Sequence, residues 1–135
     1  MSEFDAVKAM LESDPQLVGR VVDTAVKDDG DVVRGTYLVL FGAGPESLDD
    51  DRYGSVPRPD SDAAFSLPVR AVSGDPEGVR LLYARVQALV GSKPVVVGRR
   101  CDPVTVRFDQ VKADTSVSPP LYFMDMWVEF TSRRA

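Results

Sequence analysis

The sequence predicts an α+β fold, in which two helices pack on a mostly antiparallel β-sheet. Two segments have the apolar spacing of amphipathic helices, one near the N-terminus and one after Asp75, and several other apolar runs have the pattern of strands. The elements follow in the order helix, strand, strand, long loop, strand, helix, strands, which is typical of α+β proteins. No repeat of 20 to 50 residues is visible, so we expect a single domain over residues 1–135.

Composition limits the class of protein. The 135 residues are 44% hydrophobic and 27% charged, as in ordinary globular proteins. The single cysteine, Cys101, excludes a scaffold held by intrachain disulfides and fits a reducing cytoplasm. No apolar run approaches the roughly 20 residues of a membrane span, and the acidic start "MSEFDAVKAML" is unlike a signal peptide. We therefore expect a soluble, unprocessed chain with no membrane partner.

Net charge and the lack of histidine bear on function. The formal charge of −5 argues against a broad nucleic-acid-binding surface, because such affinity comes from Lys and Arg that neutralise phosphates. An acidic wall around a DNA path is compatible with this charge, since it would repel the duplex. The chain contains no histidine, the commonest general base and metal ligand, and this makes an enzyme less expected.

The first helix is predicted between Ser2 and Asp14, with Phe4, Val7 and Leu11 at helical spacing. The next stretch, "DPQLVG", predicts one further turn, because Asp-Pro both ends a helix and starts a new turn. A strand, "RVVDTAV", follows at residues 20–26.

A tight connection and a second strand are predicted next. The run "KDDGD", Lys27 to Asp31, has the Asp and Gly residues that a hairpin requires. After it, "VVRGTYLVLF" predicts a strand over residues 32–41. Its stretch Tyr37 to Phe41 is apolar on both faces, which indicates a central strand that is covered on both sides.

A long loop is predicted from Gly42 to Ala63. The segment is rich in Gly and Pro, contains three consecutive Asp residues and has few apolar ones. Loops longer than about 12 to 15 residues are uncommon in compact domains and tend to be functional or disordered. We therefore expect this loop to be flexible.

The next strand, "AFSLPVRAVSG", has two alternating faces. One face holds Phe65, Leu67, Val69 and Ala71, and the other holds Ser66, Pro68, Arg70 and Val72. Because Pro68 cannot donate a ladder hydrogen bond, this strand is predicted to be an edge strand or to contain a bulge.

The second helix, predicted from Asp75 to Val90, has the clearest local signals. Asp75 is a suitable N-cap, a proline follows at the first helical position, and Gly91 stands where a C′ residue belongs. Leu82 and Val86 belong to its apolar stripe, and we expect them to pack on the sheet.

The C-terminal third predicts a short strand, a turn and two long strands. The turn lies around Cys101 to Pro103 and the short strand precedes it. The long strands, roughly Val104 to Lys112 and Leu121 to Thr131, are expected to be antiparallel neighbours.

Motifs for catalysis, cofactors or metals are weak. The "GAG" at Gly42–Gly44 superficially resembles a dinucleotide fingerprint, but Ser47 occupies the third glycine position and no amphipathic helix follows. The acidic runs "DDGD" and "DDD" lack the spacing of a calcium loop. Cys101 lies beside Arg99 and Arg100 but has no histidine partner, so we expect a buried or incidental thiol. No cofactor and no enzymatic activity are expected.

Three segments in series resemble a known family. They are "VRAVSGDPEGVRLLYARVQALVG", "VVVGRRCDPV" and "DTSVSPPLYFMDMWVEF". In this order they resemble the tail terminator proteins of long-tailed, siphovirus-type phages, especially those of actinobacterial hosts and their prophages. The resemblance covers roughly Tyr37 to Arg133, and the loop 42–63 shows little of it.

The resemblance implies a structural protein of the virion tail, present in the host cytoplasm during assembly. Such proteins form a homohexameric ring that caps the head-proximal end of the tail tube, ends its polymerisation and provides the surface for head–tail joining. The implied partners are further copies of the chain, the tail tube protein and a head completion or connector protein. Genomic DNA would pass through the channel without specific binding.

Two other classes stay open. A different head–tail joining ring protein is the nearer alternative, because such proteins have similar size and also form rings. A small-molecule-binding α+β domain is the more distant one.

The last strand has two faces of different character. An apolar face, expected to pack on the core, holds Tyr122, Met124, Met126, Val128 and Phe130. The opposite face mixes aromatic and acidic side chains, Phe123, Asp125, Trp127 and Glu129. This mixed face either lies partly under the first helix or contacts a neighbouring subunit, whose arginines would meet the carboxylates.

A ring of identical subunits uses heterologous contacts, so each chain needs apolar surface beyond its own core. We expect Asp49 to Asp51 in the long loop to lie at the lumen or an end surface of the ring. The candidate interface or lumen residues are Asp49, Asp50, Asp51, Arg52, Arg99, Arg100, Phe123, Asp125, Trp127 and Glu129.

Overall fold

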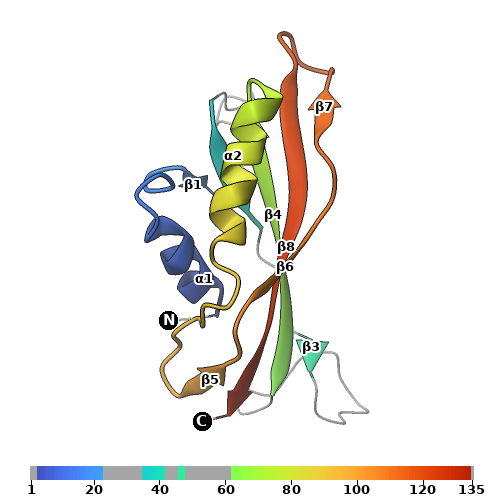
Figure 1. Cartoon of the computed structure of the whole chain (residues 1–135). Coiled ribbons are helices and arrows are strands. Elements are labelled where there is room, and N and C mark those ends of the chain that lie inside the picture. The colour runs from blue at the N-terminus through green and yellow to red at the C-terminus, as the bar shows by residue number, and fades with distance from the viewer. Residues whose placement is uncertain (1–2, 23–34, 42–45, 48–61, 135) are drawn as a thin grey trace.

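The structure is a computed structural model that describes residues 3–22, 35–41, 46–47 and 62–134. Within these residues the chain forms two helices and eight strands, which confirms the predicted α+β class (Figure 1). The helices are α1, Glu3–Glu12, and α2, Pro76–Gln87. The strands are β1, Val21–Val22; β2, Tyr37–Leu40; β3, Glu46–Ser47; β4, Ala63–Ser73; β5, Arg99–Cys101; β6, Thr105–Phe108; β7, Lys112–Asp114; and β8, Leu121–Arg134.

All strands belong to one sheet with the order β1-β2-β4-β8-β5. Strand β3 lies beside β4, and β6 and β7 lie beside β8. The two long strands, β4 and β8, run antiparallel from Ala63 opposite Ser132 to Ser73 opposite Tyr122. They form the axis of the elongated molecule in Figure 1. Neither helix of the described part is long and apolar enough to cross a membrane.

Strand β4 is central, so the predicted edge position of Pro68 is wrong for the strand as a whole. It pairs with β2 on one side and with β8 on the other. Proline is tolerated because the β2 ladder ends there: the Phe41 N–H donates to the Pro68 carbonyl at 2.9 Å, one residue beyond the last assigned pair, Leu40 with Val69. Pro68 faces the end of a neighbouring strand, where a missing N–H costs least.

The first two strands correct the predicted hairpin. Val21 lies opposite Leu38 and Val22 opposite Val39 in a parallel pair. Parallel neighbours need a long crossover and cannot be joined by a tight hairpin. The predicted turn residues, Lys27 to Asp31, themselves lie outside the described residues.

The predicted double burial is confirmed for Tyr37 to Leu40, whereas Phe41 lies beyond β2 and is exposed. Leu38 and Leu40 belong to the main core, whereas Tyr37 and Val39 belong to a smaller cluster on the other face of the sheet. All four side chains are buried.

The predicted loop 42–63 is corrected at two points. Glu46–Ser47 forms the short strand β3 beside the start of β4, and Ala63 already belongs to β4. Residues 42–45 and 48–61, which include Asp49, Asp50, Asp51 and Arg52, lie outside the described residues.

Helix α2 begins as predicted and ends earlier. The Asp75 carboxylate accepts from the Gly78 N–H at 2.6 Å, which confirms the N-cap. The helix stops at Gln87 because the Leu89 N–H bonds to Val86, three residues back, at 3.0 Å. Gly91, with φ of 93°, follows this turn rather than the helix.

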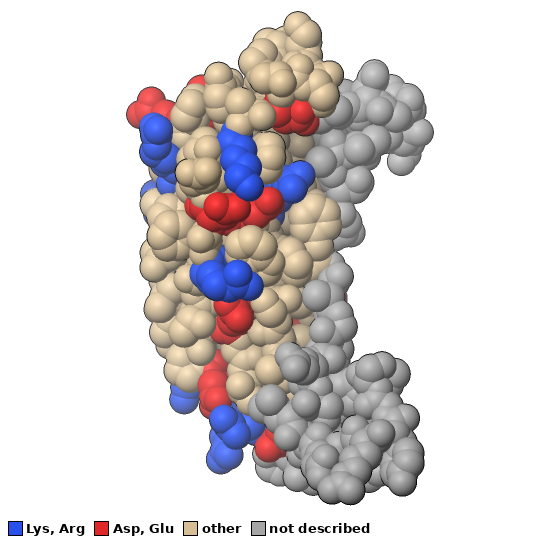
Figure 2. Space-filling view, turned by 90° about the vertical axis from the view of Figure 1, so that its right-hand side faces the viewer, with Lys and Arg blue, Asp and Glu red and all other residues tan. Residues whose placement is uncertain are grey.

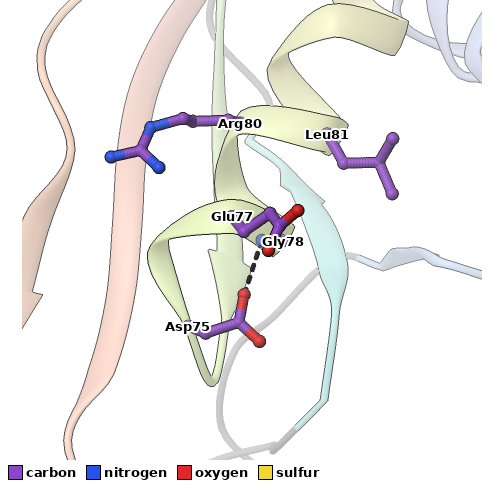
Figure 3. Close-up of a pocket in the computed structure, with 5 residues that line it drawn as sticks. All are labelled: Asp75, Glu77, Gly78, Arg80 and Leu81. Carbon is purple, nitrogen blue, oxygen red and sulfur yellow. Dashed lines mark hydrogen bonds between the residues drawn. The ribbon is translucent and has the colours of Figure 1, made fainter.

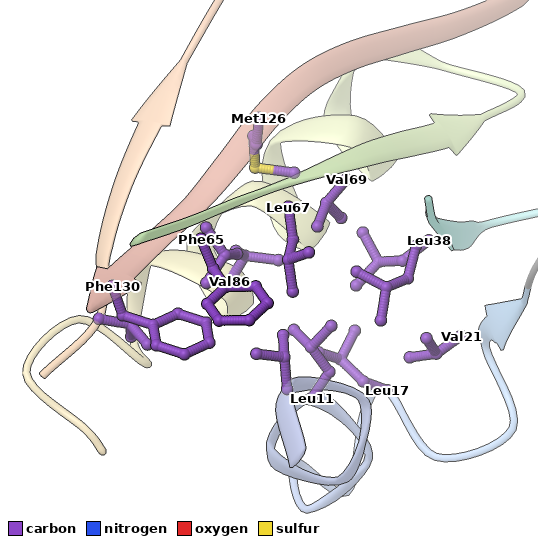
Figure 4. Close-up of a cluster of buried hydrophobic side chains, with 14 of the residues drawn as sticks. Leu11, Leu17, Val21, Leu38, Phe65, Leu67, Val69, Val86, Met126 and Phe130 are labelled. Carbon is purple, nitrogen blue, oxygen red and sulfur yellow. The ribbon is translucent and has the colours of Figure 1, made fainter. Parts of the chain in front are cut away.

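Both helices cover the same face of the sheet. Leu11 of α1 and Val86 of α2 are fully buried against Leu67 of β4 and Met126 of β8 (Figure 4). Leu17, in the predicted turn after α1, fills the space beside them. This layer is the main hydrophobic core, and it leaves the other face of the long strands away from the helices.

The C-terminal edge is more broken than predicted. The two predicted long strands are antiparallel, which is confirmed, but β6 and β7 are separated by a bulge. From Phe108 to Lys112 the edge advances four residues while β8 advances three, from Met126 to Phe123. The turn was predicted to begin at Cys101. In the structure it begins one residue later, because Arg99–Cys101 forms β5 and pairs with β8.

Candidate assembly surface

We call the side of the sheet opposite the helices the open face. The residues that define it are Ser66, Pro68, Arg70, Thr105, Arg107, Phe123, Asp125, Trp127 and Glu129. Period-2 alternation places these side chains opposite Leu67, Val69, Met126 and Val128 of the core. Figure 2 views the molecule from this side and shows basic and acidic side chains that alternate along its length.

The upper ion pair of the open face joins β4 to β8. Arg70 lies directly opposite Asp125 in the register. Its Nε donates to Asp125 Oδ1 at 2.8 Å and its Nη2 to Oδ2 at 3.3 Å, which makes the pair bidentate. The same guanidinium lies over the Phe123 ring, 4.4 Å from its centroid.

The lower ion pair repeats this arrangement between β6 and β8. Arg107 Nε donates to Glu129 Oε1 at 3.0 Å, and its guanidinium lies 4.4 Å from the centroid of the Trp127 ring. These side chains are partly exposed, so each pair contributes at most about 1 kcal/mol to stability. Their geometry matters more, because each arginine is held at its edge by a carboxylate and on its face by an aromatic ring.

The structure overturns one of the two interpretations of the mixed face of β8. Helix α1 lies on the core side, so the interpretation that Phe123, Asp125, Trp127 and Glu129 lie under the first helix is wrong. The arginines that meet the carboxylates come from the same chain.

Two further ion pairs continue the alternation toward the ends of the sheet. Lys112 Nζ lies 3.0 Å from Asp109 Oδ2, and Arg133 Nη2 lies 3.1 Å from Asp102 Oδ2. The hydrogen bond from Lys112 lowers the pKa of Asp109, and the hydrogen bond to Asp102 raises the pKa of Arg133. Both shifts favour the charged forms of these groups.

The two predicted arginines before Cys101 have different positions. Arg99 is turned inward: its Nε donates to Ser132 Oγ at 3.0 Å and lies 3.7 Å from Glu3 Oε1 of α1. Its side chain is 12% exposed, so we leave it out of the assembly surface. Arg100 is exposed and lies opposite Arg133, on the same side of the sheet as the open face.

Cys101 is a free, buried thiol, as one of the two predicted alternatives has it. Burial raises its pKa above the ordinary value, and the Ser132 hydrogen bond only partly offsets this effect. The thiol is therefore protonated at neutral pH.

Two surface hollows offer little to a ligand. One, of about 500 Å³, lies at the start of α2 and is lined by Asp75, Glu77, Gly78, Arg80 and Leu81 (Figure 3). There the Asp75 carboxylate caps the helix, and Arg80 and Leu81 point to opposite sides. The other, of about 320 Å³, is lined in part by Asp102 and Glu129, which are engaged in the ion pairs above. Among the described residues no acidic or cysteine cluster is placed to hold a metal ion.

The most exposed apolar side chains are found away from the open face, whereas Phe41, which lies opposite Pro68, is 39% exposed on it. Val95 and Val97 are 77% and 91% exposed in the segment between α2 and β5, with Val96 buried between them. Val18, after α1, is 62% exposed. Such side chains gain most from contact with another surface.

Sequence reasoning missed Arg70 and Arg107 as members of the surface. Alternation alone puts Arg70 on the polar face of its strand. Their pairing with Asp125 and Glu129 depends on strand register, which no local signal in the chain specifies.

Comparisons with known proteins bear on the fold. No family model matches the sequence, and no curated protein matches it either. Among solved structures, the fold is similar to a chain described as "Virion of native gene transfer agent (GTA) particle", with a TM-score of 0.55 and 19% identity. The similarity covers 97% of this chain and 91% of that chain. At this identity the comparison establishes a shared fold.

Proposed function

We propose that this chain is a structural protein of a phage-like virion, and specifically a tail terminator. Copies of the chain form a homohexameric ring that caps the head-proximal end of the tail tube and ends its polymerisation. The ring then presents the surface on which the head completion proteins dock. The observation that carries this proposal is the fold shared, over nearly the whole length of both chains, with a chain of a gene transfer agent virion.

The sequence supports the narrower part of the proposal. The three segments that resemble tail terminators map onto the middle and C-terminal parts of the fold, from β4 through α2 and β5 to β8. On the open face, the carboxylates Asp125 and Glu129 and the nearby Asp102 take part in ion pairs.

Ring formation requires apolar surface outside the core. The exposed valines Val95 and Val97 supply such a surface on each copy. A heterologous ring brings this patch against a different part of the next subunit.

The test is negative-stain imaging of the purified chain, alone and mixed with tubes of the cognate tail tube protein. We expect rings at one end of each tube and a narrow distribution of tube lengths when the chain is present during polymerisation. Unchanged tube lengths and bare tube ends would contradict the terminator role.

A different head–tail joining ring protein remains the second candidate, because such proteins have similar size and also form rings. This candidate predicts rings that bind the connector but leave tube polymerisation unchanged. Pull-down with tubes and with connectors in parallel separates the two functions.

A further inference from the structure

The open face holds its basic groups in a form that is already paired. Four ion pairs follow one another along this side of the sheet (Figure 2). They are Lys112–Asp109, Arg70–Asp125, Arg107–Glu129 and Arg133–Asp102, with nitrogen–oxygen distances of 2.8 to 3.1 Å. Four basic and four acidic groups give these pairs no net charge, although the whole chain carries −5.

In the two central pairs, a carboxylate accepts from donors that arginine also uses to bind phosphate. Arg70 uses Nε and Nη2 for Asp125, and Arg107 uses Nε for Glu129. One side of each guanidinium plane is covered by an aromatic ring at 4.4 Å. A phosphate that approaches must compete with a carboxylate for the same donors.

Each simpler charge pattern would interact strongly with a duplex. A row of free arginines would hold DNA by neutralising phosphates, and a row of free carboxylates would oppose its entry. A row of paired charges neither holds the duplex nor opposes its entry.

We propose that the open face lines the path of duplex DNA, and that Asp125 and Glu129 mask Arg70 and Arg107 so that the duplex passes without being held. This inference rests on the proposed function, in which the genome crosses the ring. A subunit contact suits this face less well, because burying charges that are already paired costs desolvation and adds no new bonds. The exposed valines at Val95 and Val97 lie elsewhere and suit such a contact better.

At one end of the open face, Arg100 is an arginine that no carboxylate of the described residues masks. It is exposed beside Arg133, and the structure shows no ion pair for it among the described residues. One cation adds little affinity, because DNA binding scales with the number of phosphates neutralised.

The test removes the two masking charges in the full-length chain. We measure the fluorescence anisotropy of a short labelled DNA duplex with the wild type and with Asp125→Asn/Glu129→Gln. The wild type is expected to bind weakly, and the double variant at least about tenfold more tightly at about 50 mM salt, with affinity that falls steeply as salt rises. Adding Arg70→Gln and Arg107→Gln to the double variant should abolish the gain.

The matched control carries the same change in net charge on the helix side. Glu12→Gln/Glu77→Gln alters two acids of α1 and α2, and its DNA binding should equal that of the wild type. If the double variant does not fold, Glu129→Gln alone provides the test. The Glu129 side chain is 38% exposed and that of Asp125 is 27% exposed, so the change at Glu129 disturbs the fold less.

Three outcomes would overturn the inference: no gain of DNA binding in the double variant, an equal gain in the control, or tight binding by the wild type. Imaging with tail tubes distinguishes a failure of the inference about the DNA path from a failure of the proposed terminator function. Bare tubes with the wild type overturn the terminator role whatever the DNA result. Rings formed by the wild type but lost in the double variant would make the open face a subunit contact and overturn the inference.

Discussion

At the scale of single residues, two positions show how local chemistry depends on distant neighbours. Cys101 stands beside two arginines in the sequence, which would lower a thiol pKa, yet burial raises it. Gly78 stands in the first turn of α2, where alanine would be the better helix former. Ser73 of β4 makes that position unusable for a larger residue.

We expect Cys101 to react slowly with a thiol reagent in the native protein. The reactive species is the thiolate, and a raised pKa together with 5% exposure leaves little of it accessible at pH 8. Ellman's reagent, followed by absorbance, should react many times faster once the chain is unfolded in guanidinium chloride. Equal rates in both states would show that the thiol is accessible.

Gly78→Ala should destabilise the protein by about 1 to 3 kcal/mol, despite the gain of about 1 kcal/mol in helix propensity. An added Cβ would overlap Ser73 Oγ and lie 2.8 Å from Ser73 Cβ, so the helix or the strand must shift. Urea unfolding measures the change. Ser73→Ala in the same chain removes the nearer atom and should restore part of the loss, whereas a stabilised Gly78→Ala protein would contradict the packing.

At the scale of elements, apolar periodicity predicted which face of each element is buried. In α2 the stripe through Leu82 and Val86 packs on the sheet as predicted, and in β8 the faces alternate as predicted. The ends were harder to predict. Helix α2 ends at Gln87 rather than Val90, because the last residues change from α-type to i→i−3 hydrogen bonds.

Leu82→Ala should lower the free energy of unfolding by about 2 to 5 kcal/mol, because it opens a cavity in the main core. Leu81→Ala is the matched control on the same helix. Leu81 is 47% exposed, so its truncation should cost less than about 0.5 kcal/mol. Chemical denaturation of both variants gives the comparison, and a Leu82 cost below about 1 kcal/mol would place the stripe against something other than the core.

Strand direction and register could not be predicted from element patterns. The Asp and Gly residues of "KDDGD" indicated a hairpin, but β1 and β2 pair in parallel. Pro68 indicated an edge, but β4 is central and the proline sits where the β2 ladder ends. In both cases the local residues have the conformational preference that the prediction used. The strand that pairs with the segment decided which structure forms.

At the scale of the whole molecule, the helices cover one face of the sheet, and the ion pairs and a smaller hydrophobic cluster lie on the other face. The charged residues of this open face come from β4, β6 and β8, which are far apart in the chain. The exposed valines lie outside it, in the segment before β5. Our two proposals therefore place assembly and DNA passage on different surfaces.

Val95→Asp/Val97→Asp should prevent ring formation and leave the subunit folded. Both side chains are more than three quarters exposed, so a charge costs little in the monomer but is expensive in an apolar contact. Analytical ultracentrifugation, with imaging on tubes, measures assembly, and thermal unfolding monitors the subunit.

Gln110→Asp/Thr115→Asp is the control for that variant, because it adds the same charge at exposed positions of the β6–β8 edge. It should assemble like the wild type. Rings of normal yield from Val95→Asp/Val97→Asp would remove these valines from the subunit contact.

The sequence by itself determined the fold class, the approximate positions of most elements and the two faces of β8. Helix and strand periodicities and the Asp75 cap are properties of neighbouring residues, so the chain encodes them locally. Only the tertiary structure decided that Asp125 and Glu129 meet Arg70 and Arg107 of the same chain and that α1 and α2 both lie on the other face of the sheet. These contacts depend on strand order and register, which arise from the packing of the whole sheet against its helices.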